Sequence, residues 1–269
     1  MEMKDITVVK LGGSILDSRD TTALDLVALQ RQGKRMVVVH GGASKVSRWL
    51  ADQGVQSQFH QGERVTDRRA LDVVVAVLCG LANKETVAAV IQAGGRAVGL
   101  SGVDGGLIQA SVKEEALGYV GVVERVDTSL LLALLEAGYI PVVSPVGLNC
   151  GAKRAGEPPF LNINGDTVAG ELAAALAAAN LIFLTDVDGV RDESGKILAA
   201  LDPAAARRLL ETGIASDGMI PKIKAALTAA AGGVCCNIVD GRRAYALMEA
   251  LTGSHSGTCL KTEAKNELG

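Results

Sequence analysis

Short apolar runs alternate with longer amphipathic stretches along most of this chain. Runs rich in β-branched and aliphatic residues, typical of strands buried on both faces, cover residues 6–9, 36–39, 97–100, 140–143, 181–185 and 234–239. Apolar residues at helical spacing predict helices over residues 44–52, 67–80, 83–93, 129–137, 166–179, 203–212, 221–231 and 242–251. Strands that alternate with helices predict an α/β fold, with a mostly parallel sheet covered on both faces.

The middle of the chain departs from this order. Residues 107–126 alternate and carry glycines, which favours a pair of antiparallel strands. Residues 147–161 hold glycines and prolines among polar residues, so we expect a loop at the seam between two lobes. The 269 residues therefore predict a single domain over residues 1–269, with an N-terminal lobe to about residue 160 and a C-terminal lobe from about residue 161.

Two glycine pairs follow directly on the first two predicted strands. Gly12 and Gly13 come after Lys10, and Gly41 and Gly42 come after the second strand. Glycines in such turns bring bare backbone N–H groups close to a ligand, and the helix that follows adds its positive end. Together with the lysine, the two turns predict a site for phosphate and carboxylate groups.

A row of polar residues opens the second lobe. Asn162, Asn164 and Asp166 occupy alternate positions. In an extended chain these three side chains share one face, an arrangement that suits a ligand site. The alternative is an Asx-rich turn in which Asp166 caps the next helix.

Two further polar segments follow apolar elements in the second lobe. Residues 185–190 come directly after a predicted strand, and open α/β sheets bind ligands beyond the carboxyl ends of their strands. An ordinary turn explains this segment equally well.

Pro221 is tolerated only in a first helical turn, which places Lys222 near a helix N-terminus. A bound anion would offset the unfavourable dipole interaction of this lysine, and a solvated lysine is the alternative.

Composition narrows the class of protein. The chain is 48% apolar and 3% aromatic, and its net charge of −3 is spread without a basic block. This balance argues against nucleic acid or an anionic membrane as the main partner. No apolar run approaches the ~18 residues that span a bilayer, and no signal-peptide core is evident. The five cysteines lack metal-ligand spacing, so we expect no protein metal site and reduced thiols in the cytoplasm.

These motifs together resemble the amino acid kinase family over residues 8–260, and within it the acetylglutamate kinase branch. The resemblance rests on segments 10–13, 40–42, 62–66, 83–84, 98–102, 118–121, 162–166 and 217–222, which read KLGG, HGG, GERVT, NK, VGLSG, GYVG, NINGD and DGMIPK. It implies a three-layer αβα sandwich around a mainly parallel sheet of about eight strands. It also implies that the N-terminal lobe binds the acyl amino acid and the C-terminal lobe binds ATP.

The same resemblance implies the catalytic residues. Lys10 and Lys222 would neutralise the transferring phosphoryl group, and Asp166 would orient both lysines. The acceptor would be the γ-carboxylate of N-acetyl-L-glutamate, which has a reference pKa of about 4.3 and needs no general base. Such a reaction depends on positioning and on cancelling the repulsion between carboxylate and triphosphate. Mg²⁺ would be held mostly by phosphates and water.

Binding residues are implied in the same way. Arg64 would bind the α-carboxylate, as suits its planar bidentate guanidinium, and Asn162 would bind the acetamido end. Gly42 and Ala43 would offer backbone N–H groups to the substrate and phosphate. The nucleotide site would comprise Gly12, Gly13, Asp186, Val187, Asp188, Gly189, Val190, Arg191, Ile214, Ala215 and Ser216.

Two positions depart from the branch. Ala43 stands where a third glycine is usual, so its methyl group narrows the pocket or requires a negative φ, and Gly165 stands where alanine is usual. The first departure leaves open a kinase for glutamate or 2-aminoadipate attached to an amino-group carrier protein, with Lys113, Lys153 and Arg154 as candidates for a basic rim. A catalytically inactive metabolite sensor on the same fold is the non-enzyme alternative.

The resemblance also bears on assembly. Arginine-inhibited members of the family carry an extra N-terminal helix that interlaces dimers into a hexamer, and here the first predicted strand begins at about residue 6. We therefore expect a homodimer that is insensitive to arginine. Leu71, Val74, Val75 and Leu78, on one face of the predicted helix 67–80, are the candidate interface, with burial in the subunit's own core as the alternative.

Overall fold

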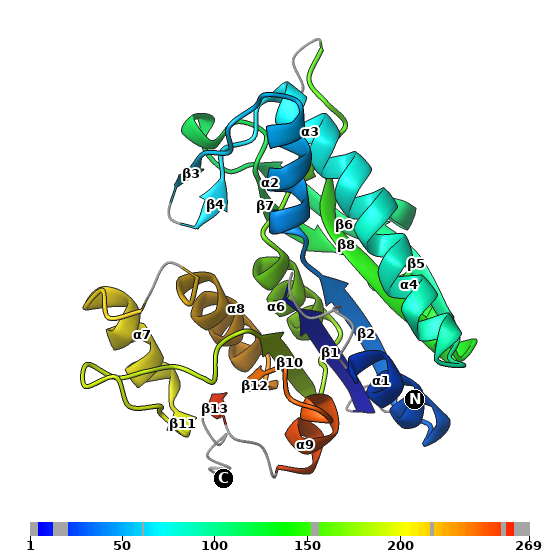
Figure 1. The fold of residues 1–269 in the computed structure, drawn as a ribbon, viewed down its shortest axis with the longest axis vertical. Helices are drawn as coiled ribbons and strands as arrows, with labels where there is room; N and C mark the ends of the chain where they lie inside the picture. Colours follow the sequence, from blue (N-terminus) through cyan, green and yellow to red (C-terminus); the bar gives the residue numbers. More distant parts are fainter. Residues whose placement is uncertain are drawn as a thin grey trace, which may run out of the picture.

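The computed structural model describes residues 5–12, 21–60, 62–151, 156–215, 218–253 and 257–260 (Figure 1). Within these residues, eleven strands form one sheet in the order β11-β13-β12-β10-β1-β2-β8-β6-β7, with β5 and β9 also paired to β8. The strands of this sheet are β1 (Ile6–Leu11), β2 (Arg35–His40), β5 (Ala97–Gly102), β6 (Ile108–Val112), β7 (Gly121–Val126), β8 (Ile140–Asn149), β9 (Phe160–Asn162), β10 (Asn180–Thr185), β11 (Ala200–Leu201), β12 (Cys235–Asp240) and β13 (Gly257–Leu260). A separate antiparallel hairpin consists of β3 (Phe59–His60) and β4 (Glu63–Arg64).

Helices cover both faces of this sheet. They are α1 (Thr22–Arg31), α2 (Ala43–Asp52), α3 (Arg68–Val75), a π-helical segment (Ala76–Ala82), α4 (Asn83–Gln92), α5 (Ser129–Glu136), α6 (Gly165–Ala175), α7 (Pro203–Glu211), α8 (Ile220–Ala231) and α9 (Ala246–Thr252), with 3-10 turns at Asp104–Gly106 and Glu115–Leu117. Figure 1 shows α2, α3 and the β3–β4 hairpin in the upper half of the molecule, α7, α8 and α9 in the lower half, and α6 between them.

The predicted α/β sandwich is confirmed. The central strands β12, β10, β1, β2 and β8 are parallel to their neighbours in this order, and antiparallel pairs occur at β12–β13, β6–β7 and β8–β9. The sheet has eleven strands among the described residues rather than about eight. The additional strands β9, β11 and β13 have only two to four residues, too few for a recognisable period.

Two predicted boundaries are wrong. The expected loop 147–161 is strand at both ends, because β8 continues to Asn149 and β9 begins at Phe160. Gly147 permits this pairing, since a Cβ there would lie 2.6 Å from Cδ1 of Ile163. The last predicted helix begins at Ala246 rather than at residue 242, because Tyr245 adopts a left-handed conformation with φ 61°.

The side chains of β1 alternate between the two faces of the sheet, and this places Lys10 on the face covered by α6 and α8. Ile6 and Val8 belong to the core beneath α6 and α8, whereas Val9 and Leu11 belong to the core beneath α1, α4 and α9. Successive side chains of a strand point to opposite faces, so Lys10 shares the face of Ile6 and Val8. The lysine therefore points toward the beginning of α6.

Helices α6 and α8 pack with almost no side-chain volume between them. A Cβ at Gly170 would lie 2.7 Å from the carbonyl oxygen of Ala225 and 2.9 Å from its Cα. Only glycine allows this approach of the two backbones. The first turn of α6 is thereby fixed relative to the first turn of α8.

Residues Arg68–Gln92 form one continuous helix of 25 residues, the only described helix long and apolar enough by length and composition to cross a membrane. The helix includes Asn83, Lys84 and Glu85, so it contains no uninterrupted apolar run of ~18 residues, and core helices of soluble proteins pass the same test. Leu71, Val74 and Leu78 are buried within the subunit, the latter two against α2. The alternative of burial in the subunit's own core is confirmed for them, and they cannot form a dimer interface.

Candidate active site

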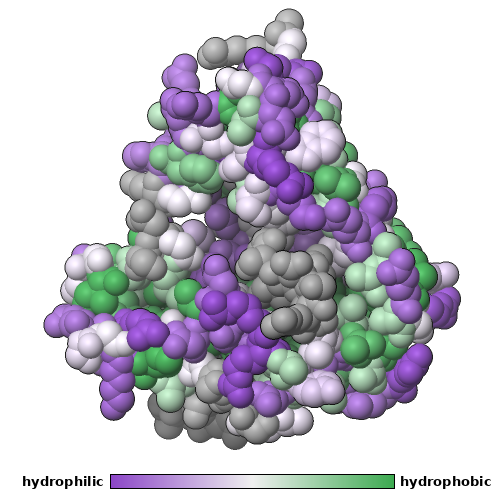
Figure 2. All heavy atoms as spheres, viewed as in Figure 1, coloured by the Kyte–Doolittle hydropathy of each residue, from purple (hydrophilic) through white to green (hydrophobic). Residues whose placement is uncertain are grey.

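A cavity of about 380 Å³ lies where the two halves of the molecule meet. Its walls come from the end of β1, the turn between β2 and α2, the β3–β4 hairpin, the end of β9 and the beginning of α6. Figure 2 shows hydrophilic residues gathered around the middle of this face. The cavity therefore combines both lobes and has the mixed polar and apolar lining of a small-molecule site.

Two lysines meet one carboxylate at its edge. Nζ of Lys10 lies 2.7 Å from Oδ1 of Asp166, and Nζ of Lys222 lies 3.3 Å from Oδ2. The Lys222 ammonium also donates to the carbonyl oxygen of Gly218 at 3.1 Å. All three side chains are nearly inaccessible to solvent. The three residues that the resemblance groups together are thus in contact, although they come from β1, α6 and α8.

The charge state of Asp166 follows from this arrangement. Burial opposes ionisation and alone would raise the pKa of this carboxyl group, but the charges and hydrogen bonds of Lys10 and Lys222 outweigh it, so the pKa lies below its usual range. Oδ1 meets Lys10 as an ion pair and has no regular hydrogen-bond partner among the described residues. The cluster carries two positive charges against one negative charge, a surplus that suits an anionic ligand.

The segment 162–166 is not a uniform extended row. Asn162 ends β9, whereas Asn164 is the N-cap of α6 and its side chain accepts from the N–H groups of Asp166 and Thr167. The expected Asx turn is therefore present, but Asn164 rather than Asp166 caps the helix. This cap leaves the Asp166 carboxylate free to meet the lysines.

Arg64 is a buried cation with neutral partners. Its guanidinium donates to the carbonyl oxygen of Ala43 and to Oγ of Ser47, both at 2.8 Å, and to the hydroxyl of Ser57. The ring of Phe59 lies 4.7 Å away, and burial lowers the pKa of the arginine. No carboxylate pairs with it among the described residues, and it lines the cavity. A buried, unpaired positive charge is costly unless a ligand supplies the negative charge.

Asn162 is tied to the same wall. Its Nδ2 donates to Oγ1 of Thr66 at 3.1 Å, and that hydroxyl donates to the carbonyl oxygen of Arg64 at 2.8 Å. Asn162 also lines the cavity. The amide of Asn162 is therefore tied through Thr66 to the backbone of Arg64. From the sequence, Thr66 has no role beyond its place in the 62–66 motif, and Ser47 and Ser57 were not identified, because hydroxyls that hold another side chain leave no spacing pattern.

The second glycine turn begins a helix at the cavity wall. Gly42 is the N-cap of α2 with φ 154°, and a Cβ there would lie 2.6 Å from Cδ2 of Leu78. Ala43 is the first helical residue and is not among the described positions of positive φ, so its methyl group fits without strain. The first N–H groups of a helix have no intrahelical acceptor, and these residues line the cavity. Ala43 is thus compatible with the turn.

The first glycine turn is only partly described. The N–H of Gly12 donates to the carbonyl oxygen of Leu184 at 2.8 Å, so it is already engaged and would not be offered to a phosphate. Gly13 lies outside the described residues. At Gly165 a Cβ would have only ordinary contacts of 3.6 Å or more, so the alanine usual in the branch would also fit.

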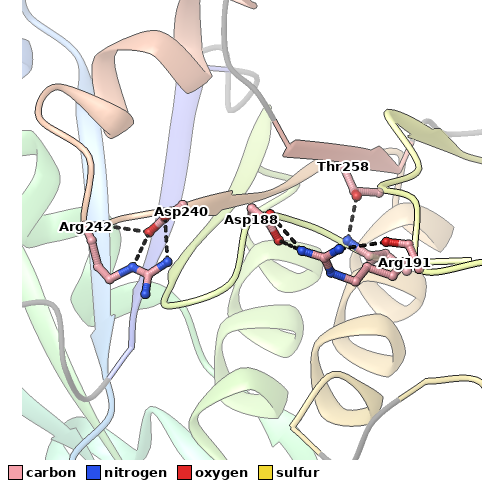
Figure 3. A network of polar contacts seen from close by, with 7 residues as sticks. Asp188, Arg191, Asp240, Arg242 and Thr258 are labelled. Carbon is pink, nitrogen blue, oxygen red and sulfur yellow. Dashed lines mark hydrogen bonds and ion pairs between the residues drawn. The ribbon is translucent and has the colours of Figure 1, made fainter.

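The loop after β10 carries most of the residues expected at the nucleotide. Asp186 lines the cavity, Val187 is exposed, and Val190 is buried. Figure 3 shows Asp188 paired with Arg191 by two contacts of 2.9 Å. A second pair joins Arg242 to the carboxylate at the end of β12. Of the described residues of this loop, only Asp186 lines the cavity.

One residue that fixes this loop was not predicted. Oγ1 of Thr258, on β13, accepts from the N–H of Val190 at 2.8 Å (Figure 3). Beside it, a Cβ at Gly189 would lie 2.8 Å from the same oxygen, so glycine is needed there. Thr258 stands in a short polar segment near the end of the chain, and only the pairing of β12 with β13 brings it to the loop.

The remaining expected residues are placed as follows. Ile214 and Ala215 are half-buried and pack against the core between α7 and α8. Ser216, Lys153 and Arg154 lie outside the described residues. Lys113 pairs with Glu63 on the hairpin, so its charge is already matched.

Comparison with known proteins agrees with this geometry. The acetylglutamate kinase of Dehalococcoides mccartyi is 46% identical over 253 residues, 94% of this chain and 93% of that protein. The acetylglutamate kinase of Thermosynechococcus vestitus is 47% identical over 263 residues, 94% of this chain and 87% of that protein. The structure of N-acetylglutamate synthase from Neisseria gonorrhoeae, with coenzyme A and N-acetyl-glutamate, is similar with a TM-score of 0.82 and 27% identity, over 97% of this chain and 60% of that chain.

The family model for amino acid kinases matches residues 5–240, which include both glycine turns, Arg64, Asp166 and Lys222. Since this match spans most of the sequence, the chain belongs to the amino acid kinase family.

Proposed function

We propose that this chain phosphorylates the γ-carboxylate of N-acetyl-L-glutamate with ATP, forming N-acetyl-L-glutamyl 5-phosphate for arginine biosynthesis. The observation that carries the proposal is the buried guanidinium of Arg64, which lines the same cavity as Lys10 and Asp166 and meets no carboxylate among the described residues. A substrate with two carboxylates can pair one with Arg64 and present the other to the lysines. The names of relatives at 46–47% identity support the same substrate.

Substrate placement follows from the cavity walls. Arg64 binds the α-carboxylate in a bidentate manner, and Asn162 binds the acetamido group. The hairpin residue Phe59 and the apolar Val120 close the sides of the same cavity. The N-terminal lobe therefore binds the acyl amino acid, and the γ-carboxylate reaches the end of β1.

Lys10 and Lys222 act on the reacting groups. The γ-carboxylate oxygen forms a bond to the γ-phosphorus of ATP, and the bond from this phosphorus to the bridging oxygen breaks to release ADP. Both partners are anionic, so the two ammonium groups lower the repulsion as they approach. Asp166 holds the lysines on either side of this path. The carboxylate is ionised before it reacts, so no residue needs to remove a proton.

The C-terminal lobe binds ATP along the loop after β10, between the Asp188–Arg191 pair and the Asp240–Arg242 pair. The donor set supports Mg²⁺ held by phosphates and water, because no cluster of three or more potential metal ligands occurs in the part of the chain that the structure describes. When bound to the triphosphate, Mg²⁺ supplies further positive charge. Asp186, which lines the cavity, is the carboxylate available to orient its water ligands.

Purified protein with MgATP tests the proposal. N-acetyl-L-glutamate should release ADP and give an acyl phosphate that hydroxylamine traps as a hydroxamate. Parallel reactions offer glutamate, 2-aminoadipate, aspartate and UMP, each of which should react far more slowly. Turnover with UMP alone, or only with an amino acid attached to a carrier protein, would overturn the assignment.

We propose in addition a homodimer in the cytoplasm. The half-exposed Leu81 and the exposed Ile91 of helix Arg68–Gln92 support a second copy as their partner, whereas Val75 packs against the subunit's own core. All five cysteines are thiols, which supports a reducing compartment. Light scattering at the mass of two chains would support the dimer, and a monomer mass would contradict it.

A further inference from the structure

A buried polar cluster lies directly behind the second glycine turn. His40 ends β2 and is 2% exposed. Its Nδ1 lies 2.8 Å from the carbonyl oxygen of Gly41, and its Nε2 lies 3.0 Å from Oγ of Ser144 and 3.2 Å from Nδ2 of Asn83. The proposed reaction uses no proton transfer, so the chemistry leaves this histidine without a role. Burial of an imidazole nevertheless has a cost that the fold must offset.

The contact with Gly41 assigns the proton. A carbonyl oxygen only accepts hydrogen bonds, so Nδ1 must carry the hydrogen and donate it. Burial lowers the pKa of His40, and the charges of Lys84 and Lys10 lower it further, against the opposing effect of the Gly41 hydrogen bond. The ring is therefore neutral near pH 7, with Nε2 as an acceptor.

This donor fixes the orientation of one peptide group. The carbonyl of Gly41 and the N–H of Gly42 belong to the same planar trans peptide and point in opposite directions. With the carbonyl held against the His40 ring, the N–H of Gly42 points away from the ring. Gly41, Gly42 and Ala43 line the cavity, and the N–H of Gly42 has no acceptor among the described residues. Its open side is therefore available to an anion.

The contacts of Nε2, on the opposite side of the ring, matter less for the orientation of the turn. The single hydroxyl hydrogen of Ser144 can go either to Nε2 or to the carbonyl oxygen of Leu78, which lies 3.1 Å from Oγ, and Asn83 also donates to the carbonyl oxygen of Val142 at 2.9 Å. Both neighbours thus keep a partner without Nε2. The carbonyl oxygen of Gly41 has no other hydrogen-bond donor among the residues described. Loss of Nδ1–H therefore releases the turn, whereas loss of Nε2 does not.

We propose that His40 is a positioning residue, whose Nδ1–H holds the Gly41 carbonyl and so aims the Gly42 N–H at the anionic group in the cavity. The proposal rests on the proposed kinase function for the identity of that group, the transferring phosphoryl. The N–H of Gly41, in the preceding peptide group, donates to the carbonyl oxygen of Leu11 at 3.0 Å, so β1 holds that peptide while His40 holds the next one. The turn is thereby held rigid next to Lys10.

Two amide substitutions separate the two ring nitrogens. In His40→Asn the side-chain NH₂ occupies the place of Nδ1, and in His40→Gln it occupies the place of Nε2. His40→Gln should lower kcat by about 10²-fold, as expected for a misplacement on the order of 1 Å, with little change in KM for ATP. His40→Asn should keep kcat within about threefold of the unaltered enzyme. Ser144→Ala is the control that removes a partner of Nε2, and it should keep kcat within the same range.

Stability is measured beside activity, because both His40 variants lose buried contacts. Urea unfolding gives the folded fraction, and kcat is expressed per folded molecule. Equal losses of kcat in His40→Asn and His40→Gln, or losses that disappear after this correction, would overturn the proposal.

Amide hydrogen exchange gives a readout that needs no turnover. Exchange across residues 41–45 should be faster in His40→Gln than in His40→Asn, and unchanged exchange in His40→Gln would overturn the positioning role. If the unaltered protein fails to phosphorylate N-acetyl-L-glutamate, the kinase proposal fails, while exchange still decides whether His40 holds the turn. The two failures are therefore distinguishable.

Discussion

Nη2 of Arg64 donates to the carbonyl oxygen of Ala43 at 2.8 Å, which joins the expected carboxylate-binding side chain to the first residue of α2. The same nitrogen contacts Ser47 one turn further along this helix. The guanidinium and the N-terminus of α2 therefore have a fixed separation. We expect a carboxylate bound by Arg64 to lie beside the first turn of this helix.

Arg64→Lys should mainly weaken binding of the amino acid. An ammonium cannot keep the contacts with Ala43 and Ser47 while also meeting a carboxylate in a bidentate manner. We expect KM for N-acetyl-L-glutamate to rise by about 10²-fold, with KM for ATP changed by less than about threefold. Steady-state kinetics with each substrate varied in turn measures both values, and substitution of the exposed Arg69 on α3, Arg69→Lys, is the control. Equal increases for the two substrates would refute the assignment of the N-terminal lobe.

Lys10→Ala and Lys222→Ala should lower kcat rather than raise KM. Each substitution removes one positive charge from the path of the phosphoryl group and leaves Asp166 paired with the other lysine. The expected loss is on the order of 10²–10³, as for one transition-state donor. The matched control is Lys224→Ala, which changes an exposed lysine on the same helix. A kcat within a few-fold of the unaltered enzyme in either lysine variant would contradict the role.

Thr258→Val should weaken the nucleotide loop. The buried N–H of Val190 loses its acceptor, which costs about 1–3 kcal/mol of unfolding free energy. Since the loop follows β10, KM for ATP should rise more than KM for the amino acid. Thr228→Val serves as the control, because that hydroxyl bonds only within α8. An unchanged KM for ATP with lowered stability would show that Thr258 supports the fold but not the nucleotide.

The unfolding free energy should decrease as the pH falls below about 6.5, because His40 is harder to protonate in the folded protein. Its pKa in the unfolded chain is near the ordinary value of 6.5, and burial lowers it in the folded protein. The unfolded state therefore binds the proton first as the pH falls, and the folded state loses stability by up to about 1.4 kcal/mol per pH unit. Asp166 does not contribute in this range, because its lowered pKa moves its transition below its usual value of 3.8.

Urea unfolding at pH 5, 6, 7 and 8 measures this effect. The unfolding free energy of the unaltered protein should fall more steeply between pH 7 and pH 5 than that of His40→Asn, which lacks the titrating ring. Both chains share every other titrating group, so the difference isolates His40. Parallel curves would contradict a lowered pKa in the folded protein.

Strands and helices with several apolar residues were predictable, and shorter elements were not. β1, β2, β10 and β12 each bury most of their residues, which leaves a continuous apolar run in the sequence. β11 has two residues and β13 has four, and they become strands only because β12 offers an edge to β13. The hairpin β3–β4 is equally short.

The site was predictable where function requires a charged or glycine residue at the end of an element. Lys10, Asp166 and Lys222 belong to such motifs, and the resemblance to the family placed them together. Residues that only hold these groups, such as Thr258 and Ser47, depend on contacts between segments far apart in the sequence. In the sequence they cannot be distinguished from serines and threonines on the surface, because only the folded sheet brings them to their partners.

The approach of Gly170 to Ala225 also limits how the enzyme can open. Because α6 and α8 are in backbone contact, Asp166 and Lys222 belong to one rigid body, whereas Arg64 and the glycine turn at Gly42 belong to the other half. If the two halves move relative to one another, we therefore expect Lys222 to stay with its carboxylate. Such a motion would move this pair as a unit relative to Arg64 and Gly42.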